Sequence, residues 1–340
     1  MIKKALTQFP VCDAHCDIAL DVLIRRERGE HCVLDERHYT RLYAGGVRLQ
    51  VIAIYVEAKD KPHKAFEKTV LQLAAILNDL KESSKFYLVK TRADLDIFPK
   101  EEQLGVILAI EGAEFLEKSI DMLAFIHLLG VRMIGLTWNQ SNRFAHGIDD
   151  AVSGRGVTPD GEALLRRFKQ YEMILDVSHL SPASIRDVLR LYEGPIVASH
   201  CGIRRVYDCP RNLLDSDIAA IAKRGGVIGI PAFPSMLADK GASIDSFVEH
   251  LKAAISIAGA DHVGIGADFI DYLKPLIAEG LAGEEWRVPE SIRIRNFESA
   301  AHFAFLPEAL GKHAISENVV KKIMSENFLR FFRTALPEIE

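Results

Sequence analysis

The chain has 340 residues, 49% of them hydrophobic, and its formal net charge at pH 7 is −5. It is long enough to bury a large core, and it lacks the basic character that is typical of nucleic-acid-binding proteins. No run of about 18 apolar residues indicates a transmembrane helix, and the first residues lack the apolar stretch of a secretory signal. The five scattered cysteines suggest no disulfide framework, so we expect a cytoplasmic protein without a membrane partner.

Eight short apolar segments are spaced along the chain like strands. They are Val11–Asp13, Arg48–Val56, Val106–Ile110, Arg132–Leu136, Ile174–Val177, Ile196–Ser199, Val227–Ile230 and Val263–Gly266. Amphipathic helical patterns lie between most of them, at Lys64–Lys81, Ser119–Leu129, Asp160–Tyr171, Pro182–Tyr192, Asp215–Arg224 and Ser243–Ala258. This alternation predicts an α/β fold, a (β/α)8 TIM-type barrel, with a doubly wound open sheet as the main competitor.

Two further segments extend this pattern. Phe86–Val89 is a candidate for an additional short strand. From Glu290 to Ala335 the sequence predicts extra C-terminal helices packed outside the barrel, and Asn318–Ala335 reads as one long helix. No composition shift marks a domain boundary, so we expect a single domain over residues 1–340.

The stretch 173–212 contains two apolar runs that end in the same dipeptide, Ser178-His179 and Ser199-His200. The helical pattern between the two runs predicts a crossover, and such a crossover makes the two strands parallel. Both histidines should therefore emerge at the same edge of one sheet. They are close enough there to share a metal ion.

Other strand ends carry ionisable residues, and in a barrel the catalytic groups sit at these carboxyl ends. His15 and Asp17 follow the first strand on one face, Glu111 follows the third, and Asp268 follows the eighth. Each alone has a structural explanation, such as a buried histidine, a helix cap or a turn residue. Together on one rim they would be costly to bury without a cation.

The ligand types suggest which metal is bound. Imidazole and carboxylate groups suit Zn²⁺ or a similar divalent ion. Five ligands exceed the need of one catalytic zinc, so two ions bridged by one carboxylate fit better, and Glu111 is the natural bridge. Cys16 and Cys201 adjoin these ligands in sequence but should face the other way, as packing residues.

Seven sequence blocks occur in one order over residues 11–271: D-A-H-C-D, A-I-E-G-A, L-G-V-R-M-I-G-L-T-W-N-Q-S-N, I-L-D-V-S-H-L-S, P-I-V-A-S-H, P-R-N-L-L-D and V-G-I-G-A-D-F. Together they resemble the renal (membrane) dipeptidase family. The resemblance implies a (β/α)8 metallohydrolase with two zinc ions that cleaves dipeptides, often with a D-residue on the C-terminal side. It implies these roles: one zinc on His15 and Asp17, the other on His179 and His200, Glu111 as bridge, Asp268 as acid/base, and Arg211 as the ligand of the substrate carboxylate.

General chemistry agrees with these implied roles. A water that bridges two zinc ions loses a proton near neutral pH and becomes a hydroxide nucleophile. Asp268 can take a proton from the attacking water and pass it to the leaving amine. Arg211 offers a bidentate fork for a terminal carboxylate, although a surface salt bridge is an equally good reading of this arginine from sequence alone.

The chain departs from the family at Trp138, where renal-type members carry a histidine thought to contact the substrate carbonyl oxygen. His146, in the same loop, is a candidate substitute, with a solvated loop histidine as the alternative reading. Phe233 and the P-A-F-P-S-M-L stretch after the seventh strand, residues 231–237, are expected to line the substrate pocket, and Phe269–Pro289 is long enough for a lid.

The sequence therefore predicts a zinc-dependent cytoplasmic dipeptidase, although other divalent ions tolerate these ligands. One alternative keeps the metals but changes the substrate to another amide or a lactone. Another is a barrel that binds without catalysis, and Trp138 is the feature in its favour. The expected partner is a small dipeptide, and a homodimer is compatible with the sequence because related dipeptidases form dimers.

Overall fold

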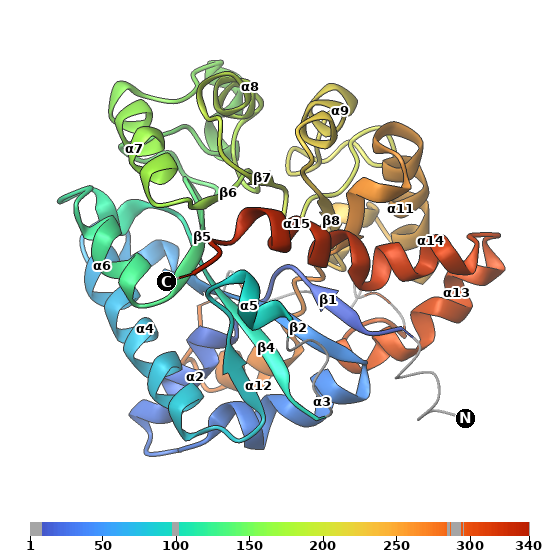
Figure 1. The fold of residues 1–340 in the computed structure, drawn as a ribbon, viewed down its shortest axis with the longest axis horizontal. Coiled ribbons are helices and arrows are strands. Elements are labelled where there is room, and N and C mark those ends of the chain that lie inside the picture. Colours follow the sequence, from blue (N-terminus) through green and yellow to red (C-terminus); the bar gives the residue numbers. More distant parts are fainter. Residues whose placement is uncertain (1–8, 97–101, 284–285, 287–293, 295, 340) are drawn as a thin grey trace.

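The computed structural model describes residues 9–96, 102–283, 286, 294 and 296–339, and it shows a barrel of parallel strands surrounded by helices (Figure 1). The strands are β1 (Val11–Asp13), β2 (Val47–Tyr55), β3 (Phe86–Leu88), β4 (Leu104–Glu111), β5 (Val131–Gly135), β6 (Ile174–Asp176), β7 (Ile196–Val197), β8 (Ile228–Ile230) and β9 (Val263–Ile265). They pair in the order β7-β6-β5-β4-β2-β1-β9-β8, with β3 beside β4. The predicted barrel and the additional strand are confirmed, and the open doubly wound sheet is wrong.

Glycines allow the barrel to close between β7 and β8. Ala198 and Ile228 form a parallel bridge, and the Gly229 amide donates to the Ala198 carbonyl over 2.8 Å. A Cβ atom added at Gly229 or Gly266 would lie 2.0 or 1.7 Å from the Ser199 carbonyl oxygen. Only glycine fits at these two positions, so they bring the ends of β8 and β9 against the segment that precedes His200.

The α-helices of the described residues surround the barrel. They are α2 (Ile18–Glu27), α3 (Tyr39–Ala44), α4 (Ala65–Glu82), α5 (Arg92–Leu95), α6 (Met122–Leu128), α7 (Pro159–Gln170), α8 (Pro182–Leu191), α9 (Asp215–Lys223), α10 (Pro234–Leu237), α11 (Ile244–Ala258), α12 (Lys274–Ala278), α13 (Leu306–Lys312), α14 (Glu317–Lys321) and α15 (Asn327–Ala335). Side-chain caps fix several starts: Thr158, Ser181 and Ser243 each accept a hydrogen bond from the amide three residues later. All six predicted helices are present.

The C-terminal helix lies across the amino-terminal end of the barrel, near the centre of Figure 1, so the extra C-terminal helices predicted outside the barrel are present. Phe328 and Phe332 of α15 join one apolar cluster with inward-facing strand residues such as Val51 and Ile107. A helical pattern shows that one face must be buried but not which surface buries it. A π-helical turn at Lys322–Glu326 joins α14 to α15, so the predicted long helix is continuous but irregular.

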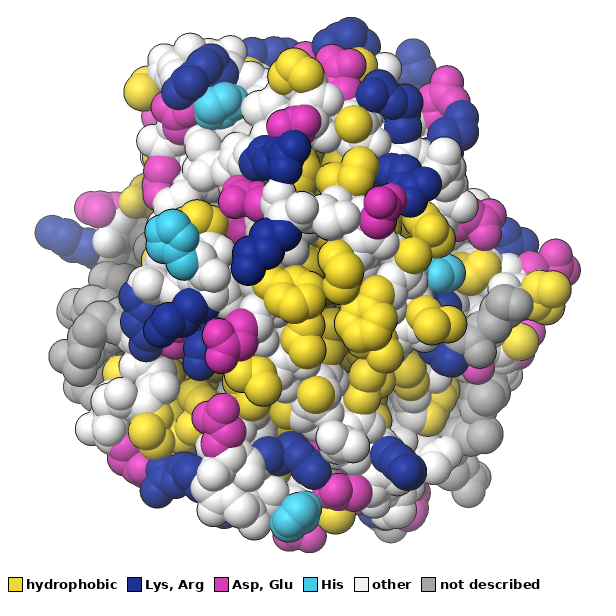
Figure 2. Space-filling view, turned by 90° about the vertical axis from the view of Figure 1, so that its left-hand side faces the viewer, with side chains coloured by type: hydrophobic (Ala, Val, Ile, Leu, Met, Phe, Trp, Pro, Cys, Tyr) yellow, Lys and Arg dark blue, Asp and Glu magenta, His cyan; other side chains and the backbone are white. Residues whose placement is uncertain are grey.

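Figure 2 looks onto the side of the barrel where α4 and α6 lie, and hydrophobic side chains gather in the middle of this face. On these two helices Leu71, Phe125 and Leu128 are 37%, 41% and 79% exposed. The expected homodimer stays a prediction. Within the described part of the chain, no helix is both long enough and apolar enough to cross a membrane.

Candidate metal centre and substrate cavity

The predicted site residues come together at the carboxyl ends of the strands. One cavity of about 240 Å³ is lined by His15, Asp17, Glu111, Trp138, His179, Arg211 and Asp268. His200 lies among them, and it is only 1% exposed. The strand register explains part of this convergence, because Tyr55, Glu111 and Asp176 sit at one level on β2, β4 and β6.

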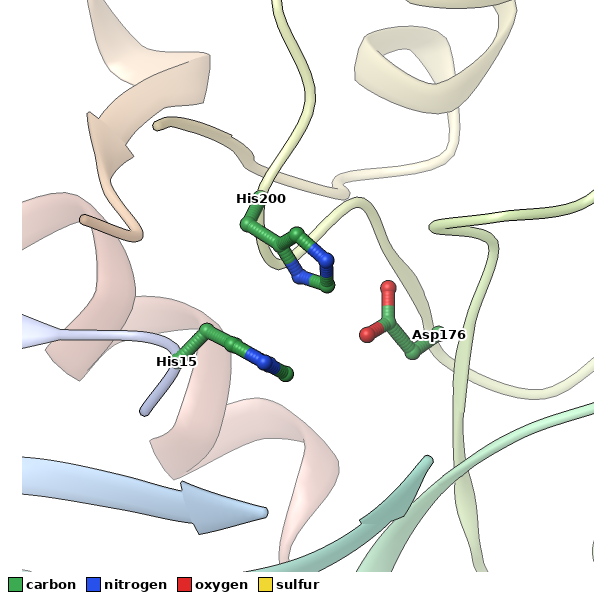
Figure 3. Close-up of side chains that lie close together, drawn as sticks. All are labelled: His15, Asp176 and His200. Carbon is green, nitrogen blue, oxygen red and sulfur yellow. The ribbon is translucent and has the colours of Figure 1, made fainter. Parts of the chain in front are cut away.

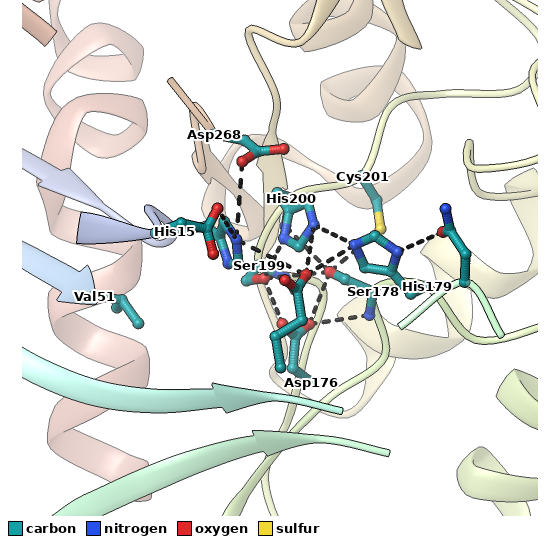
Figure 4. Close-up of polar contacts among 12 residues, drawn as sticks. His15, Val51, Asp176, Ser178, His179, Ser199, His200, Cys201 and Asp268 are labelled. Carbon is teal, nitrogen blue, oxygen red and sulfur yellow. Dashed lines mark hydrogen bonds and ion pairs between the residues drawn. The ribbon is translucent and has the colours of Figure 1, made fainter. Parts of the chain in front are cut away.

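The hydrogen bonds of His179 and His200 determine which ring nitrogen carries the proton. His179 Nδ1 lies 2.7 Å from Asn139 Oδ1, which can only accept, so we assign the proton of the neutral ring to Nδ1. His200 Nδ1 lies 2.8 Å from Ser199 Oγ. Since that hydroxyl donates its own proton to Asp176, His200 also carries its proton on Nδ1 (Figure 4).

Both histidines therefore present an Nε2 lone pair to the same small space. The two Nε2 atoms are 2.9 Å apart. Glu111 Oε1 lies 2.8 Å from His179 Nε2 and 3.4 Å from His200 Nε2. Three electron-pair donors so close together repel one another, and a divalent metal ion among them would turn this repulsion into coordination.

His15 is the centre of a second group. Its Nε2 atom lies 3.7 Å from Asp17 Oδ2, 3.8 Å from Glu111 Oε1 and 3.9 Å from Asp268 Oδ1. Burial alone would lower the pKa of His15, but the three carboxylates outweigh it and raise this pKa to about 10. The three carboxylates around His15 thus strongly favour a positive charge at this place.

The pKa values of His179, Glu111 and Asp268 are also shifted from their usual values. Burial and the charge of Arg211 lower the pKa of His179 to about 3. Burial works to raise the pKa of Glu111, but the charges of His179 and His15 hold it at about 2. Burial, together with the carboxylates of Asp17 and Glu111, raises the pKa of Asp268 well above its usual range.

The residues present fit a pair of metal ions. His15 Nδ1, Asp17 Oδ1 and Glu111 Oε1 are buried and have no hydrogen-bond partner. Ligand atoms of His15, Asp17 and Glu111 lie within 4.8 Å of one another, and so do those of Glu111, His179 and His200. Because Glu111 belongs to both groups, the geometry is compatible with a bridging role for this carboxylate.

Asp176 is a buried carboxylate that the sequence reasoning did not select. It lies within 4.8 Å of ligand atoms of His15 and His200 (Figure 3), but its oxygens are already engaged. Its Oδ1 accepts from the Ser178 amide at 3.0 Å, the Ser178 hydroxyl at 2.8 Å and the Ser199 amide at 3.0 Å, and its Oδ2 accepts from the Ser199 hydroxyl. Asp176 therefore orients the two Ser-His segments instead of offering a free ligand.

We expect Asp176→Asn to weaken zinc binding by roughly 10- to 100-fold, because groups that orient metal-binding histidines have effects of this size. An amide nitrogen in place of Oδ2 cannot accept the Ser199 proton, so His200 would lose its fixed tautomer. Competition with a chromophoric chelator measures the affinity. Zinc affinity equal to that of the wild type would show that Asp176 has no orienting role.

Aromatic side chains form one wall of the cavity. The Trp138 ring centroid lies 5.8 Å from that of His179 and 5.1 Å from that of Tyr55, and Tyr55 lies 5.1 Å from Trp286. The ammonium group of Lys61 sits 5.3 Å from the Trp138 ring centroid. Trp138 thus lines the cavity beside the candidate metal ligands, and it has no imidazole group like that of the histidine found at this position in renal-type members.

Sequence reasoning missed three residues that line the same cavity: Tyr55, Asn139 and Cys209. Ser235 and Met236, which also line it, belong to the stretch expected around Phe233, and Trp286 falls within the predicted lid. Tyr55 could have been found, because it ends β2 just as Glu111 ends β4. The expected pocket residue Phe233 does line the cavity. Cys16 and Cys201 are buried, as expected for packing residues. The predicted lid falls partly on residues 284–285 and 287–289, outside the described part, and stays a prediction.

His146 bonds within its own loop. Its Nδ1 atom lies 2.6 Å from Asp150 Oδ2, and it is not among the described residues that line the cavity. We therefore expect His146→Ala to change kcat/KM for a dipeptide by less than about threefold, because His146 does not line the cavity that holds the candidate metal ligands. Steady-state kinetics test this. A loss of about 100-fold would instead identify His146 as the substitute for the family histidine.

The chain matches a family model and is similar to several known proteins. The model of the membrane dipeptidase family, peptidase family M19, matches residues 1–282. An uncharacterized protein of Acinetobacter calcoaceticus is 30% identical over 57% of this chain and 65% of its own length. Dipeptidase 3 of Macaca fascicularis is 25% identical over 98% of this chain and 66% of its own length. The matched part is thus just under two thirds of either relative.

Solved structures show the same fold. A dipeptidase described as a metallopeptidase of family M19 superposes with a TM-score of 0.84 at 24% identity, covering 97% of this chain and 99% of the other. A metallopeptidase from Rhodobacter sphaeroides, bound to a phosphinate mimic of the dipeptide L-Ala-D-Ala, superposes with a TM-score of 0.83 at 23% identity. This match covers 96% of this chain and 99% of the other. Because the family model matches most of the chain, the protein belongs to the membrane dipeptidase family, peptidase family M19.

Proposed function

We propose that the protein is a zinc-dependent dipeptidase, and that its substrates include dipeptides with a C-terminal D-residue. The observation that carries this proposal is the arrangement of two histidine–carboxylate groups that share Glu111 at the floor of a cavity with Arg211 in its wall. Family membership supports the reaction class. The related R. sphaeroides enzyme, which binds a mimic of L-Ala-D-Ala, supports the stereochemical part.

In this proposal His15 and Asp17 would hold one metal ion, His179 and His200 would hold the other, and Glu111 would be a ligand shared by both groups. When bound, the ions lower the pKa of a water molecule and polarise the scissile carbonyl. Asn139 keeps His179 in the tautomer that presents Nε2, because its Oδ1 atom lies 2.7 Å from His179 Nδ1. Asp176 does the same for His200 through Ser199, whose Oγ atom lies 2.8 Å from His200 Nδ1 and donates to Asp176. The ligands are therefore positioned before any ion arrives.

Asp268 is placed to move the proton. It borders the cavity, and its Oδ1 atom lies 3.9 Å from His15. Its φ angle is 57°, a left-handed conformation that is uncommon outside glycine and concentrates at functional sites. A carboxyl group with a raised pKa can accept a proton from the attacking water and then donate it to the leaving amine.

Arg211 explains why the proposed substrates are dipeptides and not longer peptides. Its guanidinium group can bind a terminal carboxylate with two parallel hydrogen bonds. The cavity of about 240 Å³ includes both this arginine and the candidate metal ligands, so a free carboxylate would lie only about one residue from the scissile bond. A longer peptide would have no carboxylate at that place.

The proposed function is tested by removing and restoring the metal. We expect the purified protein to hydrolyse L-L and L-D dipeptides, to lose this activity on dialysis against a chelator, and to regain it with zinc. Release of free amino acids is the measurement. A protein that carries no metal and hydrolyses none of the dipeptides, even after zinc is added, would contradict the proposal.

A further inference from the structure

A second cavity adjoins the first on the side of β8 and β9. It measures about 260 Å³ and lies between the loop after β8, the loop after β9 and α12. Most of its described lining residues are apolar, among them Ile270, Ile277 and Phe297. Ile270 and Phe297 are at most 9% exposed, whereas Lys274 and Ala278 are exposed near its edge.

The two cavities share a boundary at the centre of the proposed chemistry. Phe233, Asp268 and Trp286 line both of them. Of the described residues, four metal-binding candidates and Arg211 line the first cavity and not the second: His15, Asp17, Glu111, His179 and Arg211. A substrate held in the first cavity would therefore lie beside the boundary with the second cavity, at Phe233, Asp268 and Trp286.

We propose that this second cavity is a substrate subsite that takes a large apolar side chain of the dipeptide, such as leucine or phenylalanine. The inference rests on the proposed dipeptidase function and names its substrate class. Apolar walls offer few hydrogen bonds to water molecules. An apolar side chain that moves from water into the cavity is stabilised by about 25 cal/mol for each Å² of apolar surface that it buries. A dipeptide hydrolysed next to Asp268 would have both of its residues near this boundary, so the side chain would come from either the N-terminal or the C-terminal residue.

The first part of the test compares wild-type kcat/KM for Ala-Ala with Leu-Ala and Phe-Ala, and separately with Ala-Leu and Ala-Phe. We expect at least about a tenfold gain over Ala-Ala in one of the two series, because even one methylene group in an apolar pocket is worth about 10-fold or more. The series that shows the gain identifies the residue whose side chain enters the subsite.

The second part uses a substitution at the edge of the cavity. Ala278→Phe places a ring there without disturbing the core, because Ala278 is exposed on α12. We expect the ratio of kcat/KM for the preferred apolar substrate to that for Ala-Ala to fall to about one. The matched control is Ala93→Phe, at an exposed position of α5 that borders neither cavity, and it should keep the wild-type ratio.

The outcomes separate the two levels of the proposal. Hydrolysis of Ala-Ala without a gain in either series, or a gain that Ala278→Phe leaves intact, overturns the subsite while the dipeptidase function stands. Hydrolysis of no dipeptide at all overturns the proposed function and the subsite together. A gain in one series that Ala278→Phe removes and Ala93→Phe keeps supports the subsite.

Discussion

Asp268→Asn is expected to lower kcat for dipeptide hydrolysis by about 10²- to 10⁴-fold, the usual contribution of a general acid–base group. Asparagine has nearly the same shape but cannot accept and return a proton. Asp268 is not among the residues assigned to hold the metals, so metal content and the thermal midpoint should remain those of the wild type. Steady-state kinetics, elemental analysis and a melting curve measure the three quantities.

A second aspartate provides the matched control for this substitution. Asp96 lies just after α5, where its side chain is 75% exposed and 3.7 Å from Arg333. Asp96→Asn removes the same charge far from the cavity and should leave kcat within about twofold of the wild type. If Asp268→Asn retained wild-type kcat, the proton-transfer role would be wrong. If it lost its metals, the residue would have to be counted among the ligands.

Arg211→Ala is expected to lower kcat/KM by roughly 10- to 150-fold, because hydrogen bonds to a charged group contribute about 1.5–3 kcal/mol. The informative comparison is between a dipeptide and the same dipeptide with a C-terminal amide. The wild type should prefer the free carboxylate, and the variant should have lost most of this preference. Arg211→Lys should recover only part of it, since lysine lacks the planar fork.

Arg205 offers a control in the same loop. Its side chain is 43% exposed and pairs with Asp215 at 3.3 Å, and it does not line the cavity. Arg205→Ala should keep the wild-type preference for a free carboxylate. If Arg211→Ala also kept this preference, the substrate would not be held by its carboxylate. Another amide or a lactone would then become the better proposal.

The site residues at the strand ends could be predicted from the sequence, because the apolar pattern locates the strands and the topology then places their ends together. Ser178-His179 and Ser199-His200 each close an apolar run, and a helix between two such runs forces the strands to be parallel. The carboxyl ends of parallel strands meet at one edge, so His179, His200 and Glu111 had to be neighbours. The structure places their ligand atoms within 3.4 Å.

Features that depend on packing between distant elements were not accessible in this way. Asp176 reads as one more residue of an apolar strand until the structure brings Ser199 from the next strand against its carboxylate. The α15 helix has an apolar face, but only the assembled barrel shows that this face covers its amino-terminal end. The second cavity arises where the loops after β8 and β9 meet α12, and loop shape carries no periodic signal.

The most direct test of the two-metal account is a zinc titration of the metal-free protein, with bound zinc and hydrolysis of an alanine dipeptide followed in the same samples. We predict that bound zinc reaches two ions per chain and that activity rises to its maximum only as the second ion binds. Full activity at one zinc ion per chain, or saturation of binding at one, would contradict the account.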